Sequence, residues 1–450
     1  MRLILLSGGS GRRLWPLSND VRAKQFLKLL RAEDGGLESM AQRVWRQIDA
    51  AGRGKPWDSI TVAAGTSQID QLRLQLGEDV DVVAEPERRD TFPAIALACA
   101  YLKSEKGAKD GDAVGVLPVD SYVEDGFFRR VAEIEGELLE TGADLILLGA
   151  KPTRPSSKYG YVVPRGGEGA HGGSEEVRRF KEKPDMDEAR ALIDEGALWN
   201  CGVFGLRLGY VLDILRDNHG VRDTGFQAVR DSFTALRKTS FDYEVVEKAK
   251  NIRVLRYEGD WKDLGTWETF TEEIDAAWGP TALEECENTH VVNELNIPVA
   301  ALGMKNAVIV AGYDGILVAE KGETYKLKEA VAEIQGRTMY EERRWGSYKV
   351  LEYDRTGGVE ALTKRLTLAA GKRTSYQYHR CRKEVWTIIG GEGVLYLDGE
   401  KRRVKAGDVV TIGVGARHGI AAEERLEIIE VQIGLPLIEE DIVHLEYDWE

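Results

Sequence analysis

The sequence predicts an α/β domain, a small β-rich connector and an all-β domain, in that order along 450 residues. Over residues 1–280, continuous apolar runs alternate with polar, helix-like stretches, which is typical of a parallel sheet covered by helices. Over 281–335 the apolar runs are short and broken by Gly and Asn. Over 336–450 apolar and polar residues alternate between Gly-containing turns, which is typical of an all-β fold. A chain of this length is too long for one core, so we expect three domains.

The apolar runs of the first domain contain β-branched residues and leucine, as fully buried strands do; they lie at 3–7, 59–65, 79–85, 112–120 and 143–150. We therefore expect a mainly parallel, Rossmann-like sheet with both faces covered. Ligands of such sheets bind at the carboxyl ends of the strands. The loops that follow Leu6 and Leu117 are the predicted positions of functional residues.

Composition excludes several classes of protein. The formal net charge of −15 argues against a general binder of nucleic acid or anionic membranes. No apolar run is long enough for a transmembrane helix, and the N-terminal run is too short for a signal peptide. The four cysteines lie far apart and form no CxxC pair, which argues against disulfides and a cysteine zinc site. These features predict a cytoplasmic protein.

A glycine-rich segment, SGGSGRR over residues 7–13, directly follows the first predicted strand. Glycines at such a turn let backbone N–H groups approach phosphate oxygens, and the two arginines add positive charge. The segment completes neither the Walker A pattern nor GxGxxG. By itself a glycine-rich turn is as often structural as functional, so its interpretation depends on the rest of the chain.

Seven motifs follow one another along the first domain. They are GGSGRRLWPLS with Lys24-Gln25-Phe26, then Glu85–Ala94, Leu117–Asp120, Tyr159–Tyr161, Phe180–Pro184, Trp199–Gly202 and Trp261–Trp267. In this order they resemble the motifs of the mannose-1-phosphate guanylyltransferases. Seven ordered matches spread over most of the first domain are hard to obtain by chance. The resemblance implies an enzyme that makes GDP-mannose and pyrophosphate from GTP and mannose 1-phosphate.

The chemistry of nucleotidylyl transfer agrees with the roles that this resemblance implies. A sugar-phosphate oxygen attacks the α-phosphorus and pyrophosphate leaves. The attacking phosphate is already ionised, so the reaction needs charge neutralisation, alignment and a divalent metal more than a general base. The resemblance implies that Arg13 and Lys24 hold the triphosphate. It implies that Asp120 and Asp263 hold Mg²⁺, which prefers carboxylate and phosphate oxygens.

Two further sets of residues follow from the resemblance. The nucleotide-binding set is Ser7, Gly8, Gly9, Gly11, Arg12, Glu85, Arg89 and Asp90. The sugar-phosphate set is Gly160, Glu182, Lys183 and Asn200, with Lys183 on the phosphate. Simpler interpretations exist beside these: Asp120 as a solvated strand end, Asp263 as a turn residue, and Lys183 as part of a surface turn.

Three departures from the family pattern leave alternatives open. Asp90 stands where the family has Asn, Ser121 where it has His, and Ala23 where it has Pro. An Asp at position 90 could accept from N1–H and N2–H₂ of guanine, yet another base or another sugar 1-phosphate stays open. A third alternative is a module that senses nucleotide-sugars without catalysis. The intact pair Asp120 and Asp263 argues against that last alternative, because a sensor needs no metal pair.

The C-terminal domain carries the spacing of two cupin motifs, which predicts a small β-barrel with a metal site. Gln377, His379 and Glu384 fit the first motif and His418 fits the second. Strand alternation directs Gln377 and His379 to the same face. Two imidazoles, a carboxylate and an amide oxygen suit Zn²⁺, Fe²⁺ or Mn²⁺. The alternative is a metal-free barrel that retains a few polar residues.

This domain also resembles the type II mannose-6-phosphate isomerase domain that is fused to such transferases. The similar motifs are Arg343–Tyr348, Ser375–His379 and Glu430–Gly434. The resemblance implies interconversion of mannose 6-phosphate and fructose 6-phosphate, which needs a metal and a base. Three histidines of the family motif are absent from 379–386, although Lys364 is kept. An active isomerase and a binding or structural cupin therefore both stay open, and so does a homo-oligomer, which the family often forms.

Overall fold

The computed structural model describes residues 1–9, 11–19, 21–52, 57–166, 173–334, 336–438 and 441–446. Ser10 of the glycine-rich segment lies outside these ranges. The chain divides into two compact units. One contains Met1–Arg13 and Ala23–Ile274, and the other contains Leu14–Arg22 and Asp275–Glu450. No helix among the described residues is both long and apolar enough to cross a membrane.

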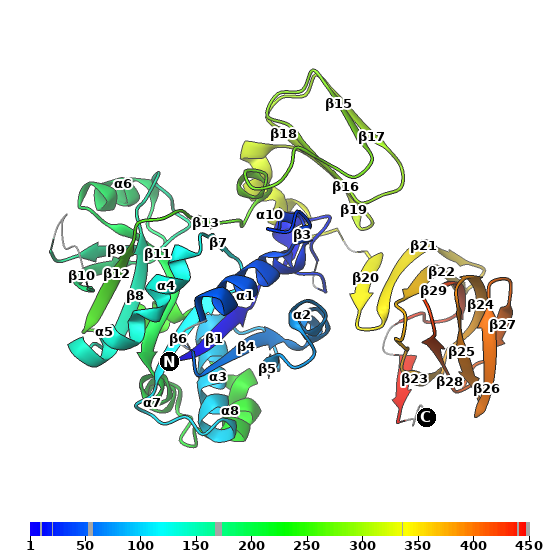
Figure 1. The fold of residues 1–450 in the computed structure, drawn as a ribbon, viewed down its shortest axis with the longest axis horizontal. Coiled ribbons are helices and arrows are strands. Elements are labelled where there is room, and N and C mark those ends of the chain that lie inside the picture. The colour runs from blue at the N-terminus through cyan, green and yellow to red at the C-terminus, as the bar shows by residue number, and fades with distance from the viewer. Residues whose placement is uncertain are drawn as a thin grey trace. The chain divides into compact units, whose positions relative to one another are not determined.

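A nine-stranded sheet forms the centre of the first unit (Figure 1). In spatial order its strands are β5 (Asp81–Glu85), β4 (Ser59–Gly65), β1 (Arg2–Ser7), β6 (Ala113–Pro118), β11 (Leu198–Arg207), β8 (Leu145–Ala150), β12 (Ile252–Tyr257), β10 (Glu175–Lys181) and β9 (Tyr161–Pro164). Strands β5, β4, β1 and β6 are parallel to one another, and so are β8 and β12, whereas β11 and β10 are antiparallel to their neighbours.

The sheet is therefore mainly parallel, as the apolar runs predicted: β1, β4, β5, β6 and β8 all run in one direction, and β11 and β10 run in the other. Both faces of the sheet are covered. Ile4 packs into one core cluster, while its neighbours Leu3 and Leu5 pack into the other. A strand that is buried on both faces has the same continuous apolar composition in either direction.

Helices cover both faces of this sheet. The face that buries Ile4 packs against α3 (Thr91–Glu105), α7 (Leu208–His219) and α8 (Phe226–Ser232). The opposite face packs against α1 (Met40–Ala51), α2 (Ile69–Leu76), α4 (Gly126–Ala132) and α5 (Ile134–Thr141). A further helix, α6 (Met186–Asp194), packs with β9. Short 3₁₀ turns, η1 (Gly11–Leu14) and η2 (Lys24–Phe26), follow β1, and β7 (Ser121–Val123) pairs with β13 (Trp261–Asp263) beyond the end of β6.

The connector consists of short parallel strands that alternate between two sheets, as in a β-helix. Strands β14 (Ala277–Trp278), β16 (His290–Asn293) and β18 (Ala307–Gly312) form one sheet, which β19 (Gly315–Glu320) closes in the antiparallel direction. Strands β15 (Thr281–Glu284) and β17 (Val299–Leu302) form the other. The side chain of Asn293 donates to the carbonyls of Pro280 and Ile297, at 2.9 and 2.8 Å, and so ties neighbouring turns together.

Residues Leu14–Arg22 pack on this connector although they lie within the first motif of the transferase domain. Arg22 makes a largely buried, two-pronged ion pair with Glu294, with N–O distances of 2.9 and 2.8 Å. The ring of Trp15 lies directly against Gly315, which leaves no room there for a Cβ. The chain between the glycine-rich segment and Lys24 is therefore held by the connector, which the sequence did not predict.

The C-terminal part folds as two antiparallel sheets. One contains β20 (Tyr340–Arg343), β21 (Gly346–Thr356), β22 (Val359–Leu368), β29 (Leu426–Gly434), β24 (Arg382–Gly390) and β27 (Val409–Ile412). The other contains β26 (Glu400–Lys405), β25 (Glu392–Leu397), β28 (His418–Ala422), β23 (Tyr376–His379) and β30 (Ile442–Leu445). Apolar side chains from both sheets form one core, in agreement with the predicted all-β fold.

Candidate active site and metal centre

Asp120 and Asp263 meet at the carboxyl end of the central sheet. Asp120 follows β6 by two residues, and the antiparallel pair of β7 with β13 places Asp263 opposite Ser121. The ammonium of Lys24 lies 2.9 Å from Asp120 Oδ2 and 3.4 Å from Asp263 Oδ1. Burial opposes the charge of Lys24, but the two carboxylates outweigh it and raise its pKa. One cation can therefore contact both carboxylates at once.

The backbone of the glycine-rich segment is open to ligand. Gly8 and Gly9 are exposed, and a Cβ at either position would meet nothing within 4 Å. Gly9 has a φ of 138°, a conformation that favours glycine. Below the turn, Gln25 donates to the carbonyl and hydroxyl oxygens of the buried Ser7, at 3.4 and 3.2 Å. Ser7 is thus part of the support of this turn, and the free space lies over the two glycines.

The two arginines follow the turn, in the 3₁₀ segment that Gly11 begins. Arg13 is exposed and Arg12 is half-buried. The positive charge of Arg13 lies near enough to Lys24 to act against the rise of the lysine pKa. Arg13, Lys24 and the two aspartates thus share one region, which brings together all four residues expected to be catalytic.

The expected nucleotide-binding residues after β5 are only partly available to a ligand. Glu85 ends β5, and burial raises the pKa of its carboxyl to about 7. Asp90 has a φ of 70°, unusual for a residue with a Cβ, and its carboxylate accepts from the backbone of Thr91 at 2.8 Å. Arg89 is engaged elsewhere, because it donates to the carbonyl of Leu236 at 2.9 Å. This hydrogen bond joins the loop that contains Arg89 to Leu236.

The four expected sugar-phosphate residues lie together. Lys183 pairs with the buried Glu182 at 2.9 Å, and Lys183 has a φ of 45°. Burial raises the pKa of the Glu182 carboxyl. The carbonyl of Gly160 accepts from the backbone of Asn200 at 2.8 Å. A Cβ on Gly160 would lie 2.5 Å from Glu182 Oε2, so only glycine lets this carboxyl take its position.

Gly160→Ala is therefore expected to displace Glu182 and raise the KM for the sugar phosphate by about tenfold or more, with the KM for nucleotide unchanged. Glu182 is expected to contact the sugar phosphate and not the nucleotide, which is why the two KM values should separate. Steady-state kinetics with each substrate varied in turn measures this. Gly136→Ala is the control, since a Cβ on that helical glycine meets nothing within 4 Å. Equal KM values for Gly160→Ala and wild type would contradict the assignment.

One residue of this region was missed by the sequence analysis. Asp242 begins η6 (Asp242–Val246), a π-helical turn, and its Oδ1 accepts from the Asn200 side chain at 2.8 Å. Burial, and next the charge of Glu182, raises the pKa of Asp242 to about 7. In the sequence Asp242 is followed by Tyr243 in an acidic, helix-like stretch, and this pattern does not indicate a site.

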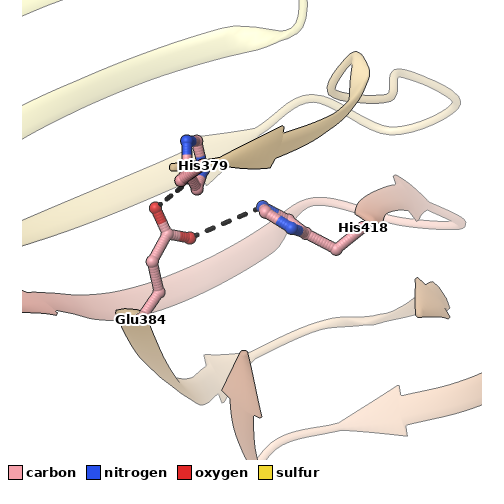
Figure 2. A group of neighbouring side chains, drawn as sticks. All are labelled: His379, Glu384 and His418. Atoms are coloured by element: carbon pink, nitrogen blue, oxygen red, sulfur yellow. Dashed lines mark ion pairs between the residues drawn. The ribbon is translucent and has the colours of Figure 1, made fainter. Parts of the chain in front are cut away.

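Three of the four expected cupin ligands converge in the barrel, each about 1% exposed (Figure 2). Glu384 lies 3.1 Å from His379 Nε2 and 3.6 Å from His418 Nε2. His418 Nδ1 donates to the carbonyl of Ala416 at 3.0 Å, and burial lowers the pKa of His418, so its Nε2 carries a lone pair. That nitrogen faces a carboxylate oxygen and has no hydrogen-bond partner among the described residues. His418 Nε2 and the Glu384 carboxylate are both acceptors that face one another in a buried site, and a metal ion between them would satisfy both.

Gln377, the fourth expected ligand, lies beside the triad with its amide nitrogen toward His379 and its amide oxygen toward Ser375. Its Nε2 is 3.5 Å from His379 Nε2, while its Oε1 accepts from the Ser375 hydroxyl at 2.8 Å. In the cross-strand register Gln377 pairs with His418 and with His444, so it is close enough to complete a site. The oxygen that would bind a metal is occupied in this state.

A second layer of buried polar residues fixes Glu384. The Trp386 indole N–H lies 3.1 Å from Glu384 Oε2 and 3.1 Å from Glu430 Oε1. Gln432 donates to both carboxyls as well, at 3.2 and 3.1 Å. Burial raises the pKa of Glu430 to about 8, while Lys364, opposite it on β22, acts against this rise. Such outer partners orient metal ligands in proteins.

The fold and these two sites define a class: a nucleotidyl transferase domain followed by a cupin. Comparison with known proteins agrees. The family model described as nucleotidyl transferase matches residues 2–277, and the model described as mannose-6-phosphate isomerase C-terminal matches residues 318–447. The chain is 31% identical to the xanthan biosynthesis protein XanB of Xanthomonas campestris pv. campestris strain B100, over 98% of this chain and 97% of that protein.

Two further relatives bear on the family. The chain is 28% identical to the mannose-1-phosphate guanylyltransferase of Escherichia coli K12, over 98% of this chain and 96% of that one. A solved structure from Thermus thermophilus, described as mannose-1-phosphate geranyltransferase, aligns with a TM-score of 0.61 and 26% identity, over 74% of this chain and 99% of that one. The chain belongs to the mannose-1-phosphate guanylyltransferase family, in its form with a C-terminal mannose-6-phosphate isomerase domain.

Proposed function

We propose that the protein transfers a guanylyl group from GTP to mannose 1-phosphate, releasing pyrophosphate. The observation that carries this proposal is the convergence of Lys24, Asp120 and Asp263 beside the open glycine-rich turn. With a divalent cation on the two carboxylates and Arg13 near Lys24, this arrangement would supply the charge neutralisation that a triphosphate needs. The identity of the nucleotide and sugar rests on the family to which the chain belongs.

Asp120 and Asp263 would hold Mg²⁺, since both already lie within 3.4 Å of one cationic atom. When bound, the metal would neutralise phosphate charge at the reacting group. Lys24 would then turn from the carboxylates to the phosphates, which lie over Gly8 and Gly9 in this proposal. Arg13 would contact the same phosphates from the exposed side. No protein base is needed, because the attacking phosphate is ionised at neutral pH.

The base and the sugar would lie in neighbouring parts of this site. Glu85 and Asp90 would accept from guanine N1–H and N2–H₂, a pair of donors that adenine lacks. Glu182 and Asn200 would bind sugar hydroxyls, and Lys183 would pair with the sugar phosphate. The charge of Asp90 contributes to the raised pKa of Glu182, so the two sides are close in space.

A second activity, isomerisation of mannose 6-phosphate and fructose 6-phosphate, is favoured by the buried triad of His379, Glu384 and His418. These residues would hold Zn²⁺, Fe²⁺ or Mn²⁺, which would polarise the substrate carbonyl when bound. Glu384 would be fixed by Trp386 and Gln432 through the contacts described above. Glu430 is a buried carboxyl beside the triad, since Trp386 and Gln432 each contact both Glu384 and Glu430.

The transferase proposal is tested with purified protein, Mg²⁺, each nucleoside triphosphate in turn and a panel of sugar 1-phosphates. We expect pyrophosphate release with GTP and mannose 1-phosphate, and much slower release with ATP, UTP or CTP. Release with another nucleoside triphosphate and sugar 1-phosphate would change the proposed substrates but not the proposed reaction. Silence across the panel would contradict an enzyme and favour a nucleotide-sugar sensor.

A further inference from the structure

Asp242 lies among the residues expected to bind the sugar phosphate. Its carboxylate accepts from the Asn200 side chain at 2.8 Å, and Asn200 Oδ1 in turn accepts from the backbone of Gly202 at 3.2 Å. The charges of Asp242 and Lys183 influence one another, which places the carboxylate near the ammonium. Asp242 also begins a π-helical turn, a rare local structure that is frequent at functional sites.

The chemistry of the pocket limits what Asp242 can bind. A carboxylate repels the phosphate of the sugar, which Lys183 would attract. It accepts readily from hydroxyl groups, and hydrogen bonds to a charged acceptor are stronger than those between neutral groups. Asn200 contacts Oδ1 of Asp242, and Asp242 is only half-buried, so its carboxylate can also accept from a sugar hydroxyl.

Asp242 is held in place by the loop on the nucleotide side. The hydroxyl of Thr91 accepts from the backbone N–H of Phe241 at 2.8 Å, one residue before Asp242. The backbone N–H of Phe92 donates to the carbonyl of Thr239 at 3.2 Å. Thr91 is also the first residue of α3, directly after Asp90. The segment that carries Asp242 is thus hydrogen-bonded to the start of the helix that follows the nucleotide loop.

We propose that Asp242 binds a hydroxyl of the sugar and that Thr91 is a positioning residue for it. This inference rests on the proposed transferase function. It gives the sugar pocket a carboxylate in addition to Glu182, and it ties the placement of that carboxylate to the loop that would contact the base. A shift of the nucleotide loop would then change sugar binding through Thr91 and Phe241.

The test is steady-state pyrophosphate release by Asp242→Asn, Thr91→Val and Thr91→Ser, with wild type in parallel. Asp242→Asn is expected to raise the KM for the sugar phosphate by about tenfold to a hundredfold, with the KM for GTP unchanged. Thr91→Val keeps the shape but loses the acceptor, so it should act in the same direction and more weakly. Thr91→Ser keeps the hydroxyl and should restore the wild-type KM.

Deoxy analogues of the sugar phosphate identify the hydroxyl. Removal of the hydroxyl that Asp242 accepts from should cost the wild type at least about tenfold in kcat/KM and cost Asp242→Asn much less. Wild-type KM values in Asp242→Asn, or equal penalties with every analogue, would overturn the inference while wild type stays active. If wild type releases no pyrophosphate with any substrate pair, the proposed function itself fails.

Discussion

Replacing Asp120 or Asp263 with asparagine is expected to lower kcat/KM for pyrophosphate release by about 10³-fold. Each aspartate lies within 3.4 Å of Lys24 Nζ, so each contributes a charge to the same point. Asparagine keeps the shape and removes that charge, which weakens the hold on a divalent cation. The rate measured against Mg²⁺ concentration should move to much higher concentrations in both variants.

Asp260→Asn is the matched control for this experiment. Asp260 directly precedes the same short strand, β13, but it is exposed, and the carboxylates that pair with Lys24 are those of Asp120 and Asp263. We expect wild-type kinetics from this variant. Wild-type rates and an unchanged Mg²⁺ dependence in Asp120→Asn or Asp263→Asn would contradict a metal role for the pair.

Glu384→Gln is expected to weaken metal binding by the cupin by at least about a hundredfold. Mutation of a residue that only orients a metal ligand already lowers metal affinity by about ten- to a hundredfold, and Glu384 would be a ligand itself. The carboxylate of Glu384 contacts both His379 and His418, one through each oxygen. Burial opposes the charge of the Glu384 carboxyl, but the two histidines and Arg382 outweigh it and hold the pKa at about 2, so the carboxyl is charged at neutral pH. Glutamine in its place cannot supply the negative charge.

Metal content after dialysis against Zn²⁺ or Mn²⁺, measured by mass spectrometry together with a titration, checks this expectation. His444→Asn is the control, because His444 is exposed on the neighbouring strand β30. It should bind metal as the wild type does. Equal affinity in Glu384→Gln and wild type, or no metal in the wild type, would mean that the barrel interior is a polar core without a metal.

The motifs predicted the family, the fold class and most of the transferase cluster because their residues lie where the strands end. Asp120 follows a buried strand, and a ligand at that edge is a general property of such sheets. The approach of Asp263 depends on the pairing of β7 with β13, which no local pattern encodes. The sequence analysis placed Asp263 in the site only through the family resemblance.

Other features had no sequence signal. Leu14–Arg22 lies within the first motif, yet it packs on the connector, because Arg22 finds its partner Glu294 far away in the sequence. Asp242 reaches the sugar residues through a π-helical turn. The orientation of the Gln377 amide depends on a hydrogen bond with Ser375. The first two features depend on contacts between distant or irregular segments, and the third depends on a side-chain rotamer; spacing along the chain reports none of them.

The central claim is tested most directly by ³¹P NMR of one reaction that contains GTP, mannose 1-phosphate, Mg²⁺ and the purified protein. We expect the signals of GTP and mannose 1-phosphate to be replaced in equal amounts by those of GDP-mannose and pyrophosphate, and Asp263→Asn to leave them unchanged. Conversion of GTP to GDP and phosphate, or no change with the wild-type protein, would contradict the account.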